Sequence, residues 1–360
     1  MRKLEDFKDD INKCSKCGLC QSVCPVYKET GNDCAVSRGK FVMLDGVLKG
    51  DLKLNKNINK YLDLCLKCDK CKSFCPSSID VCRIFETAKY EYVKNTFTGK
   101  FIFFLESKYV FGNFIKFFKL LSKPFRKKYT KKSCDSIKVL YFKGCVNNIC
   151  PHTDNILTKI FKDTNIEIIE KDFDCCGLPF LSSGNLERFE EVKKHNLKML
   201  ECEYDYILTD CASCESTLKQ YTDAKFISIG ELIVMQNIKF KFPKPVKVTF
   251  HKPCHMENDD FFKPLIDNCE NVEYIKMQDY DDCCGFAGEF ALKNNKISRA
   301  LSKKKAQNII ASDTDFVLTS CPGCILGLKQ GLSGFKKAPK IFNIIDFLSK
   351  SAIIIDKSAK

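Results

Sequence analysis

The sequence predicts an α+β multidomain protein in which a helical amino-terminal domain precedes a duplicated α/β domain. Three observations support this fold class. Two runs of four cysteines lie between Cys14 and Cys75, a segment of helical periodicity separates them, and the rest of the chain repeats itself at intervals of about 110 residues. With 360 residues and 44% hydrophobic content, the chain is long enough for two or three domains with cores of their own.

The two amino-terminal cysteine runs have identical spacing. "CSKCGLCQSVCP" begins at Cys14 and "CLKCDKCKSFCP" at Cys65, and each reads C-x2-C-x2-C-x3-C-P, which is typical of two-cluster bacterial ferredoxins. Because the fourth cysteine of each run binds the other cluster, we expect two [4Fe–4S] cubanes rather than two structural zinc sites. The predicted ligands are Cys14, Cys17, Cys20 and Cys75 for one cluster, and Cys65, Cys68, Cys71 and Cys24 for the other.

The segment between the runs predicts helices rather than the short β-rich link of a compact ferredoxin. Leu44, Val47 and Leu48, for example, share one face of a helix. We therefore expect a helical ferredoxin domain over residues 1–95. Two cysteines fall outside the cluster pattern and are expected to be ordinary buried side chains: Cys34 and Cys82.

A basic, aromatic linker is expected over residues 96–134. Between Lys100 and Lys132 the chain has ten basic residues and one acid, Glu106, so much of the formal charge of +14 is local. Residues 108–123 form an amphipathic helical pattern with phenylalanines on one face and lysines on the other. Two interpretations stay open, a helix resting on an anionic membrane or a linker helix packed on the protein or a partner subunit. We expect no nucleic-acid partner, since no nucleic-acid module is recognisable.

The remaining chain consists of two predicted repeats, residues 135–240 and 241–350. "ILTDCASCESTLKQ" at Ile207–Gln220 matches "VLTSCPGCILGLKQ" at Val317–Gln330 at seven of fourteen positions. In each copy short strand patterns such as "VLYFKGC" and "VTFHKPC" alternate with helical stretches, which predicts a mostly parallel sheet. The cysteines follow the predicted strands, at the carboxyl edge where open α/β sheets bind ligands.

Each repeat also contains a pair of adjacent cysteines, in "DFDCCGLP" and "DDCCGFAG". Adjacent cysteines make a strained disulfide, and they lack the spacing of a zinc knuckle. The charged amino terminus gives no sign of secretion and no apolar run is long enough to span a membrane, so we expect reduced thiols in the cytoplasm. Two neighbouring thiolates can instead bind different irons of one larger cluster.

These motifs together resemble the iron–sulfur subunits of glycolate oxidase and D-lactate dehydrogenase type. They are also similar to the heterodisulfide reductase D subunit, which fuses a C-type ferredoxin half to a B-type half. The ferredoxin runs with "GC…CCG…CxxC" and "HKPCH…CCGFAG…CPGC" carry the resemblance from Cys14 to about Leu332, and "SRGK" at Ser37–Lys40 is closest to the glycolate-oxidase type. It implies a cysteine-rich (CCG) domain in each repeat and up to two noncubane [4Fe–4S] clusters. The implied ligands are Cys145, Cys175, Cys176, Cys211 and Cys214, and Cys254, Cys283, Cys284, Cys321 and Cys324.

The resemblance leaves two oxidoreductase functions open. In the first, the chain is a subunit that relays electrons from a flavoprotein dehydrogenase, acting on a 2-hydroxy acid such as glycolate or lactate, to a quinone or other acceptor. In the second, it is a heterodisulfide-reductase-like enzyme that reduces or forms a disulfide. The catalytic residues would then be Cys254, Cys283, Cys284, Cys321, Cys324 and His255.

Both functions need a partner, because the chain lacks a G-x-G-x-x-G or P-loop motif for a flavin or nucleotide. We expect an electron-donating subunit and a membrane- or quinone-linked partner, with the chain in the cytoplasm or peripheral at the inner face of the membrane. His251 and His255 flank Cys254, and one of them could donate a proton, with simple packing as the alternative. His152 and His195 have no such context. Four more cysteines are expected in the core: Cys134, Cys150, Cys202 and Cys269.

Overall fold

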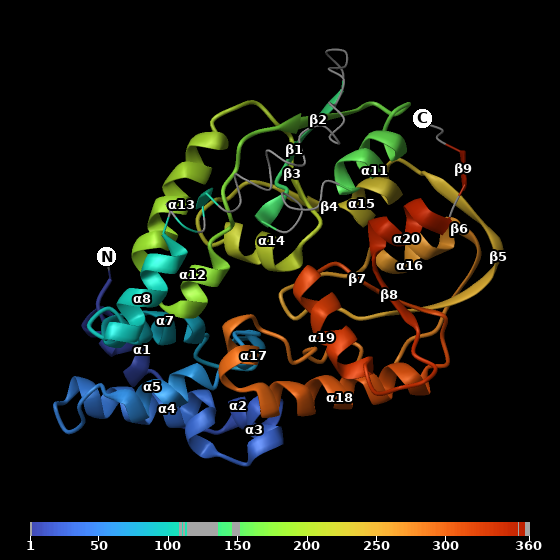
Figure 1. Ribbon diagram of the computed structural model, residues 1–360. Coiled ribbons are helices and arrows are strands. Elements are labelled where there is room, and N and C mark those ends of the chain that lie inside the picture. The colour runs from blue at the N-terminus through green and yellow to red at the C-terminus, as the bar shows by residue number, and fades with distance from the viewer. Residues whose placement is uncertain are drawn as a thin grey trace.

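A computed structural model of the chain describes residues 2–107, 110, 112–113, 136–145, 152–351 and 353–356. The predicted fold class is confirmed in this part of the chain, since helices alone are followed by two α/β portions with parallel sheets (Figure 1). Most of the helix predicted over residues 108–123 lies outside the described residues, as do Cys134 and Cys150.

The amino-terminal portion is built from short helices around one apolar core. Its elements are η1 (Leu4–Phe7), α1 (Lys8–Asn12), α2 (Leu19–Val23), α3 (Pro25–Thr30), η2 (Asp33–Ala35), α4 (Ser37–Leu48), α5 (Lys56–Asp63), α6 (Lys70–Ser73), α7 (Val81–Val93) and α8 (Phe97–Glu106). Side chains fix where helices begin: Asn55 caps α5, and Asp80 accepts a hydrogen bond from the backbone of Arg83 at the start of α7. Leu44 of α4 and Ile84 of α7 are fully buried in the core, as the periodicity around Leu44 predicted.

The first repeat is a four-stranded parallel sheet in the order β2-β1-β3-β4. The strands are β1 (Ile137–Tyr141), β2 (Ile166–Glu170), β3 (Tyr206–Thr209) and β4 (Phe226–Ser228). The helices are α11 (His152–Ile160), α12 (Leu178–Ser183), α13 (Leu186–Met199), α14 (Ala212–Leu218) and α15 (Ile229–Met235).

The second repeat has the same parallel order, β6-β5-β7-β8. Its strands are β5 (Lys239–Phe250), β6 (Cys269–Tyr274), β7 (Phe316–Thr319) and β8 (Lys340–Asn343). Its helices are α16 (Phe262–Asp267), α17 (Glu289–Lys293), α18 (Asn295–Ala311), α19 (Pro322–Leu332) and α20 (Ile344–Ser351). An added strand, β9 (Ile353–Asp356), pairs antiparallel with β5. The sequence pattern did not predict the first half of β5, where two prolines accompany a shift of register between Lys241 and Val246.

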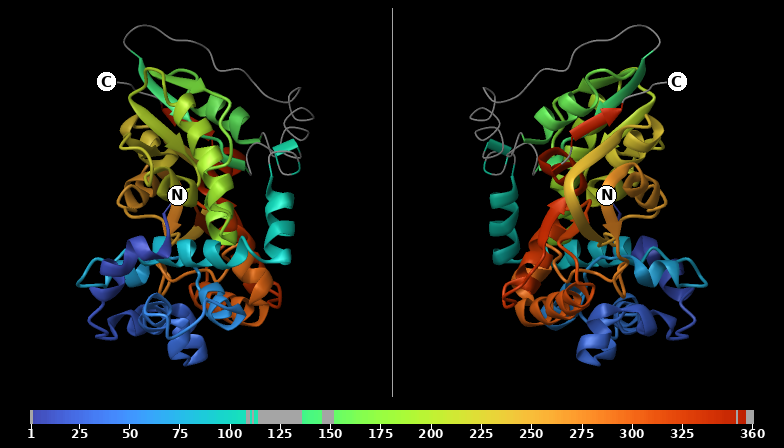
Figure 2. Two further views of the ribbon diagram at one scale, coloured as in Figure 1. Left: turned by 90° about the vertical axis from the view of Figure 1, so that its left-hand side faces the viewer. Right: turned by 90° about the vertical axis from the view of Figure 1, so that its right-hand side faces the viewer.

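One apolar core joins the two sheets. It combines Tyr141 and Leu208 of the first sheet with Phe250 and Leu318 of the second, and helices α11, α15, α16 and α20 contact one another around it. The helical amino-terminal portion lies below both sheets (Figure 2). This packing matters for the site, because it brings the cysteine-bearing turns of the repeats toward each other and toward the ferredoxin-type loops.

Candidate metal centres

The two ferredoxin-type loops share an unusual backbone shape. In the first loop Lys16 and Gly18 have φ angles of 56° and 86°, and in the second Lys67 and Asp69 have φ angles of 53° and 54°. A non-glycine residue at positive φ is strained by about 1 kcal/mol or more. Lys16 and Lys67 have this strained backbone at the same position of their loops, which is explained if each loop must bend around a bound group.

The first predicted ligand set lies together in the structure. Cys14, Cys17, Cys20 and Cys75 line one cavity of about 30 Å³. Cys71, which the spacing assigns to the other cluster, lines the same cavity, so it lies between the two sites. The assignment of each thiol to one cluster stays a prediction.

The second predicted set surrounds Cys65. The backbone N–H of Lys67 donates to Cys65 Sγ at 3.4 Å. Burial raises the pKa of the thiols of Cys24, Cys68 and Cys71, and the nearby charge of Cys65 raises it further. These four thiols are therefore close enough to influence one another electrostatically, as a shared ligand set requires.

A fifth thiol, Cys82 at the start of α7, contacts this second site. Its hydrogen bond lowers the pKa of Cys65 to about 5, and the positive charge of Lys40 adds to the effect. Lys40 is itself 1% exposed and donates to the backbone oxygen of Leu64 at 2.8 Å. A low pKa favours the thiolate, which is the form that binds metal. Sequence reasoning missed this contact, because no spacing rule connects Cys82 with Cys65.

The five cysteines of each repeat contact one another in the same order. Sulfur-to-sulfur hydrogen bonds connect, in the first repeat, Cys145, Cys175, Cys176, Cys214 and Cys211. The equivalent series in the second repeat is Cys254, Cys283, Cys284, Cys324 and Cys321. Both predicted five-cysteine sets are thus brought together by the fold, although their role as ligands stays a prediction.

Glycine is required directly after each adjacent pair. Gly177 has a φ of 100°, and a Cβ there would lie 2.5 Å from the ring of Phe189. Gly285 has a φ of 79°, and its Cβ would lie 2.8 Å from the Cβ of Leu301. Only glycine allows the chain to turn here while a helix packs closely behind the cysteine pair.

The sulfur contacts change the acidity of the central thiol in each repeat. Hydrogen bonds from Cys175 and Cys214 lower the pKa of Cys176 below its ordinary range. The equivalent Cys284 has a pKa lowered to about 5 by the corresponding neighbours, Cys283 and Cys324. Each repeat therefore holds a buried thiol with thiolate character at the middle of its series.

The separate cysteine groups also contact one another. Cys211 of the first repeat hydrogen-bonds Cys321 of the second. Cys68 of the ferredoxin portion packs in one cluster with Cys254, whose charge raises the pKa of Cys68 beyond the effect of burial. Together with Cys71, these contacts connect the first ferredoxin-type site, the second, the second repeat and the first repeat in one series.

His255, a predicted catalytic residue, bonds to the loops of all three portions. Its Nε2 lies 2.7 Å from the backbone oxygen of Lys67, and its Nδ1 lies 2.9 Å from Ser213 Oγ. Since a carbonyl only accepts, Nε2 carries the hydrogen and donates it. Ser213 Oγ is also 3.5 Å from the Sγ of Cys321. Sequence reasoning singled out His255 but missed Ser213, which sits between the two cysteines of "CASC".

His251 lies deeper in the second repeat. Its side chain is fully buried, and one ring nitrogen and the sulfurs of Cys284 and Cys324 all lie within 4.8 Å of one another. Burial, followed by the charge of Lys305, lowers the pKa of His251 to about 3, so the ring is neutral at pH 7. His195 bonds to the backbone oxygen of Asp172, and the side chain of His152 lies outside the described part.

Buried ion pairs hold the ferredoxin portion on both repeats. Lys89 Nζ of α7 lies 2.7 Å from Asp63 and 2.5 Å from Glu289 of the second repeat, and it donates to the backbone oxygen of Ser182 in the first repeat at 2.6 Å. Lys67 Nζ pairs with Glu86 of α7 at 3.0 Å and donates to the backbone oxygen of Leu181 in the first repeat at 2.6 Å. These contacts fix the relative positions of the cysteine groups.

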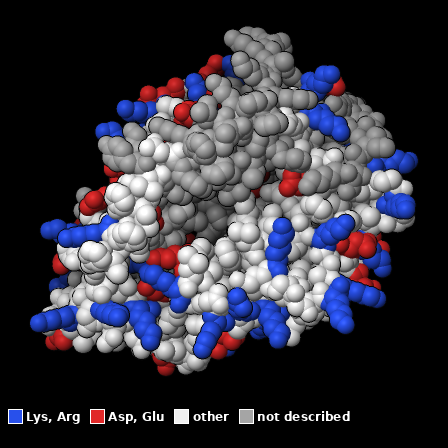
Figure 3. Space-filling view, in the orientation of Figure 1, with Lys and Arg blue, Asp and Glu red and all other residues white. Residues whose placement is uncertain are grey.

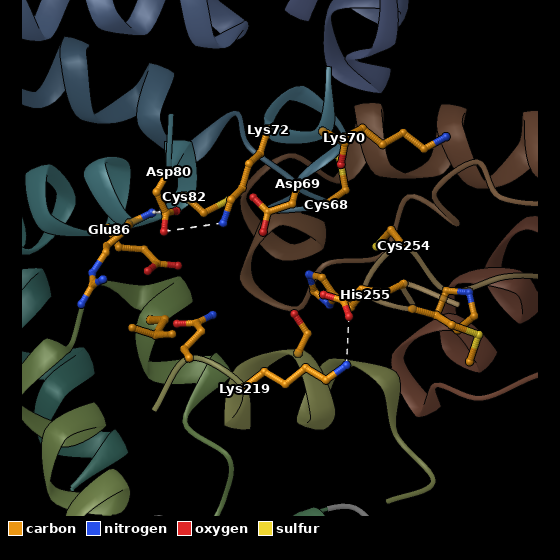
Figure 4. A pocket seen from close by; sticks show the side chains of 18 of the residues that line it. Cys68, Asp69, Lys70, Lys72, Asp80, Cys82, Glu86, Lys219, Cys254 and His255 are labelled. Atoms are coloured by element: carbon orange, nitrogen blue, oxygen red, sulfur yellow. Dashed lines mark hydrogen bonds and ion pairs between the residues drawn. The ribbon is translucent and has the colours of Figure 1, made fainter. Parts of the chain in front are cut away.

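A large cavity opens where the three portions meet. It has a volume of about 970 Å³ and is reached by Cys68, Cys82, Cys254 and His255. Figure 4 shows these side chains approaching from the amino-terminal helices and from the second repeat, with Lys219 of the first repeat opposite. Most lysines at its wall form ion pairs, for example Lys219 with Glu257 at 2.9 Å. The positive charges at the wall are therefore largely neutralised, and thiols and an imidazole are exposed to the cavity.

The donor set fits iron–sulfur clusters. No two cysteines in the described part of the chain are joined by a disulfide, and many of them hydrogen-bond another sulfur. The packing of an apolar core does not require so many thiols in contact, whereas iron–sulfur clusters require soft thiolate ligands. The remaining described cysteines differ: Cys269 is buried in the shared core, and burial raises its pKa to about 12, while Cys202 donates to the backbone oxygen of Met199.

Part of the outer surface is basic. Lys and Arg side chains are prominent along the lower edge of the molecule in Figure 3, where α18 exposes Lys296, Arg299, Lys303 and Lys304. Among the described residues, no helix combines the length and the apolar character needed to cross a membrane.

Comparison with known proteins agrees with these sites. The cysteine-rich domain family (CCG) matches residues 139–219 and 248–329, and the 4Fe-4S dicluster domain matches residues 10–79. An uncharacterized iron–sulfur protein of Methanococcus maripaludis is 27% identical over 96% of this chain and 74% of its own. A fumarate reductase (CoM/CoB) subunit of Methanothermobacter marburgensis is 27% identical with the same coverage. The probable glycolate oxidase iron–sulfur subunit of Bacillus subtilis is 21% identical over 96% of both chains.

Each of these findings bears on the expectations from sequence. The two matching domains cover the ferredoxin-type loops and both five-cysteine repeats, and the named relatives are oxidoreductase subunits. The resemblance predicted from the motifs is confirmed: the chain has a 4Fe-4S dicluster domain followed by two cysteine-rich (CCG) domains.

Proposed function

We propose that the chain is an iron–sulfur subunit that relays electrons from a flavoprotein dehydrogenase acting on a 2-hydroxy acid to a quinone or another acceptor. The observation that carries this proposal is a series of neighbouring thiols through all three portions, which are hydrogen-bonded or close enough to shift each other's pKa. It leads from Cys71 and Cys65 to Cys68 and Cys254, and across Cys321 to Cys211. Thiols arranged only to stabilise separate domains would not need to meet at every domain boundary.

The residues that would hold the groups are those already described. The ferredoxin-type cysteines would hold two [4Fe–4S] cubanes, and the five-cysteine series would hold up to two noncubane [4Fe–4S] clusters. When bound, such clusters supply one-electron transfer at potentials set by charge, burial and hydrogen bonds to sulfur. The chain itself contributes the fixed spacing, through Lys89 and Lys67, and the exclusion of water around the buried thiols.

The names of the relatives support a subunit role. One relative is named as a glycolate oxidase iron–sulfur subunit and another as a subunit of a fumarate reductase (CoM/CoB). We infer a partner subunit that oxidises the organic substrate.

A second candidate function is favoured by the cavity of about 970 Å³, which reaches Cys254 and His255. Here the chain reduces or forms a disulfide of a small thiol. In reduction the S–S bond breaks, two electrons arrive from the ferredoxin portion, and two protons complete the two product thiols. His255 lines the cavity and carries a hydrogen on Nε2, now donated to the carbonyl of Lys67, and we propose that it supplies one of these protons.

Purification of the tagged chain from its own cells, without oxygen, distinguishes the two functions. The relay predicts a flavoprotein that co-purifies and electron transfer from a 2-hydroxy acid to a quinone analogue, with no activity in the isolated chain. The disulfide enzyme predicts that the isolated chain changes its electron paramagnetic resonance (EPR) spectrum when a thiol is added. A chain with neither property would contradict both.

We further propose that α8 places the protein on an anionic membrane surface. Phe97, Phe101 and Phe104 follow one face of α8 and are 86%, 56% and 61% exposed, and the strongly basic sequence up to Lys132 comes next. Helix α8 stands at the outer edge of the molecule (Figure 2). Aromatic residues beside clustered lysines are typical of surfaces that bind anionic lipid.

Vesicle sedimentation tests the membrane proposal. Vesicles with phosphatidylserine should bind the chain and uncharged phosphatidylcholine vesicles should not, and F101D/F104D should lose most of the binding. Replacement of the exposed Leu292 of α17, as L292D, is the matched control and should leave binding unchanged. Equal binding to both vesicles, or no effect of F101D/F104D, would contradict the proposal.

A further inference from the structure

The side chain of His251 presents a polar group that the protein leaves without a partner. The residue follows β5, and its backbone N–H donates to Leu318 of β7 at 2.9 Å, which fixes the start of the side chain. The side chain is 0% exposed and, apart from a contact with the backbone of Tyr280, neither Nδ1 nor Nε2 makes a hydrogen bond in the described part of the chain. Leaving a buried donor or acceptor unpaired costs about 1–3 kcal/mol, so such a group needs an explanation.

The surroundings of the ring supply one. A ring nitrogen lies within 4.8 Å of both Cys284 Sγ and Cys324 Sγ, and all three side chains are buried. Cys284 is the central thiol of the second-repeat series, and Cys324 is its neighbour. Imidazole nitrogen and thiolate sulfur are both established ligands of iron. The three donors therefore face one shared position.

The first repeat shows that the fold does not need a histidine here. His251 stands three residues before Cys254, and the equivalent position, three residues before Cys145, is Phe142. Phe142 is fully buried as well and packs in an apolar cluster with the cysteines of its own repeat. A phenylalanine thus fills this place in the same architecture, and the histidine adds a nitrogen without being required for packing.

We propose that His251 is a nitrogen ligand of the iron–sulfur group that Cys284 and Cys324 hold in the second repeat. This proposal rests on the proposed binding of a cluster in that repeat and adds a sixth donor to its five cysteines. The first repeat, with Phe142, then holds its group through sulfur alone. The potential of an iron–sulfur centre depends on its ligands and their charge, so an added neutral imidazole would make the two repeats differ in potential despite equal cysteine sets.

Pulsed EPR on the whole chain, purified anaerobically with ¹⁵N-histidine, tests the proposal directly. The chain has four histidines. We expect a hyperfine coupling from a directly bound imidazole nitrogen on the signal that C324S removes, with a change in the spectrum between ¹⁴N and ¹⁵N label. H251F, which copies the first repeat, should lose this coupling. H255Q is the matched control and should keep it, because His255 bonds to Ser213 and Lys67 instead.

Iron analysis separates the possible failures. Iron in the second repeat without a histidine coupling, or a coupling that survives in H251F, would overturn this inference alone. If the second repeat of the wild-type chain holds no iron, the proposed function and the inference fail together. If H251F does not fold, the labelled wild type and H255Q still decide, since a coupling that H255Q removes would belong to His255 and contradict the assignment.

Discussion

The two cysteine-rich repeats share a ligand frame and differ in what surrounds it. Both connect five cysteines in the same order, and both turn at a glycine after the adjacent pair. Around the second repeat, however, lie His251, His255 and the cavity, together with the contact from Cys68. The first repeat contacts the cysteines of the second through Cys211 and Ser213, and Phe142 stands at the position of His251.

This difference indicates that the two repeats have different functions, although they arose by duplication. The sulfur frame is the part that a cluster requires, and it is kept in both copies. The polar groups that could tune a potential or deliver a proton are concentrated in the second repeat, whose Cys254 lies beside Cys68 of the ferredoxin portion. The first repeat nevertheless contributes to the second, because Ser213 reaches across to Cys321 while its counterpart in "CPGC" is Gly323.

The largest expected effect comes from removing the central thiol of either repeat. C284S should lose about 4 irons per chain, and so should the matched variant C176S. A thiol-dependent EPR change, if the disulfide function holds, should vanish in C284S and persist in C176S, since of the two five-cysteine sets only the second lines the cavity in the described structure, through Cys254. The same loss of response in both variants would contradict the division between the repeats.

A smaller effect should follow from breaking the ion pairs that hold both repeats on the ferredoxin portion. K89M removes the buried cation between Asp63 and Glu289, which keep Lys293 as their other partner. The loss should therefore stay below the about 3–5 kcal/mol that an uncompensated buried charge costs. Anaerobic unfolding in denaturant measures the loss. K263M, which breaks an exposed pair with Asp267, is the control and should cost about 0–1 kcal/mol. Equal losses of unfolding free energy in the two variants would show that Lys89 does not hold the ferredoxin portion on the repeats.

The smallest effect tests the hydroxyl that crosses between the repeats. Ser213 has one hydroxyl hydrogen, which it can donate to Cys321 Sγ only when it does not donate it to His255 Nδ1. A hydrogen bond to a ligand sulfur stabilises the reduced form, so S213A should lower the potential of the second-repeat signal in an EPR redox titration if the sulfur receives that hydrogen. We expect about a tenfold change in the ratio of oxidised to reduced protein, or ~59 mV for one electron. S216A on the same helix is the control, and S213T should restore the wild-type potential. A shift confined to the first-repeat signal would contradict the crossing contact.

Local spacing predicted much of this molecule. The ferredoxin-type ligand sets depend on residues two and three positions apart, and the strand patterns around Cys211 and Cys321 repeat with half of their residues identical. Strand, turn and helix follow from such short segments, so the fold class and the gathering of each five-cysteine set could be anticipated. The added strand β9 could not, because its pairing with β5 joins residues more than 100 positions apart.

The contacts between the sites depend on how three portions pack, which no local pattern contains. Lys67 is a loop lysine in sequence, yet its carbonyl receives the hydrogen bond of His255, 188 positions away. Cys82 became part of the second ferredoxin-type site only through the packing of α7. In the sequence His251 is one of two histidines near Cys254. The structure distinguishes them, because His251 is fully buried beside Cys284 and Cys324, whereas His255 bonds to Lys67 and Ser213.

Iron and acid-labile sulfide per chain, measured on anaerobically purified protein, test the central claim most directly. Two cubanes in the ferredoxin portion account for about 8 irons, and filled five-cysteine sets in both repeats raise the total to about 16. We predict a value near 16, with loss of about 4 in each of C176S and C284S. A value near 8 that neither variant changes would contradict the account, because the repeats would then hold no clusters.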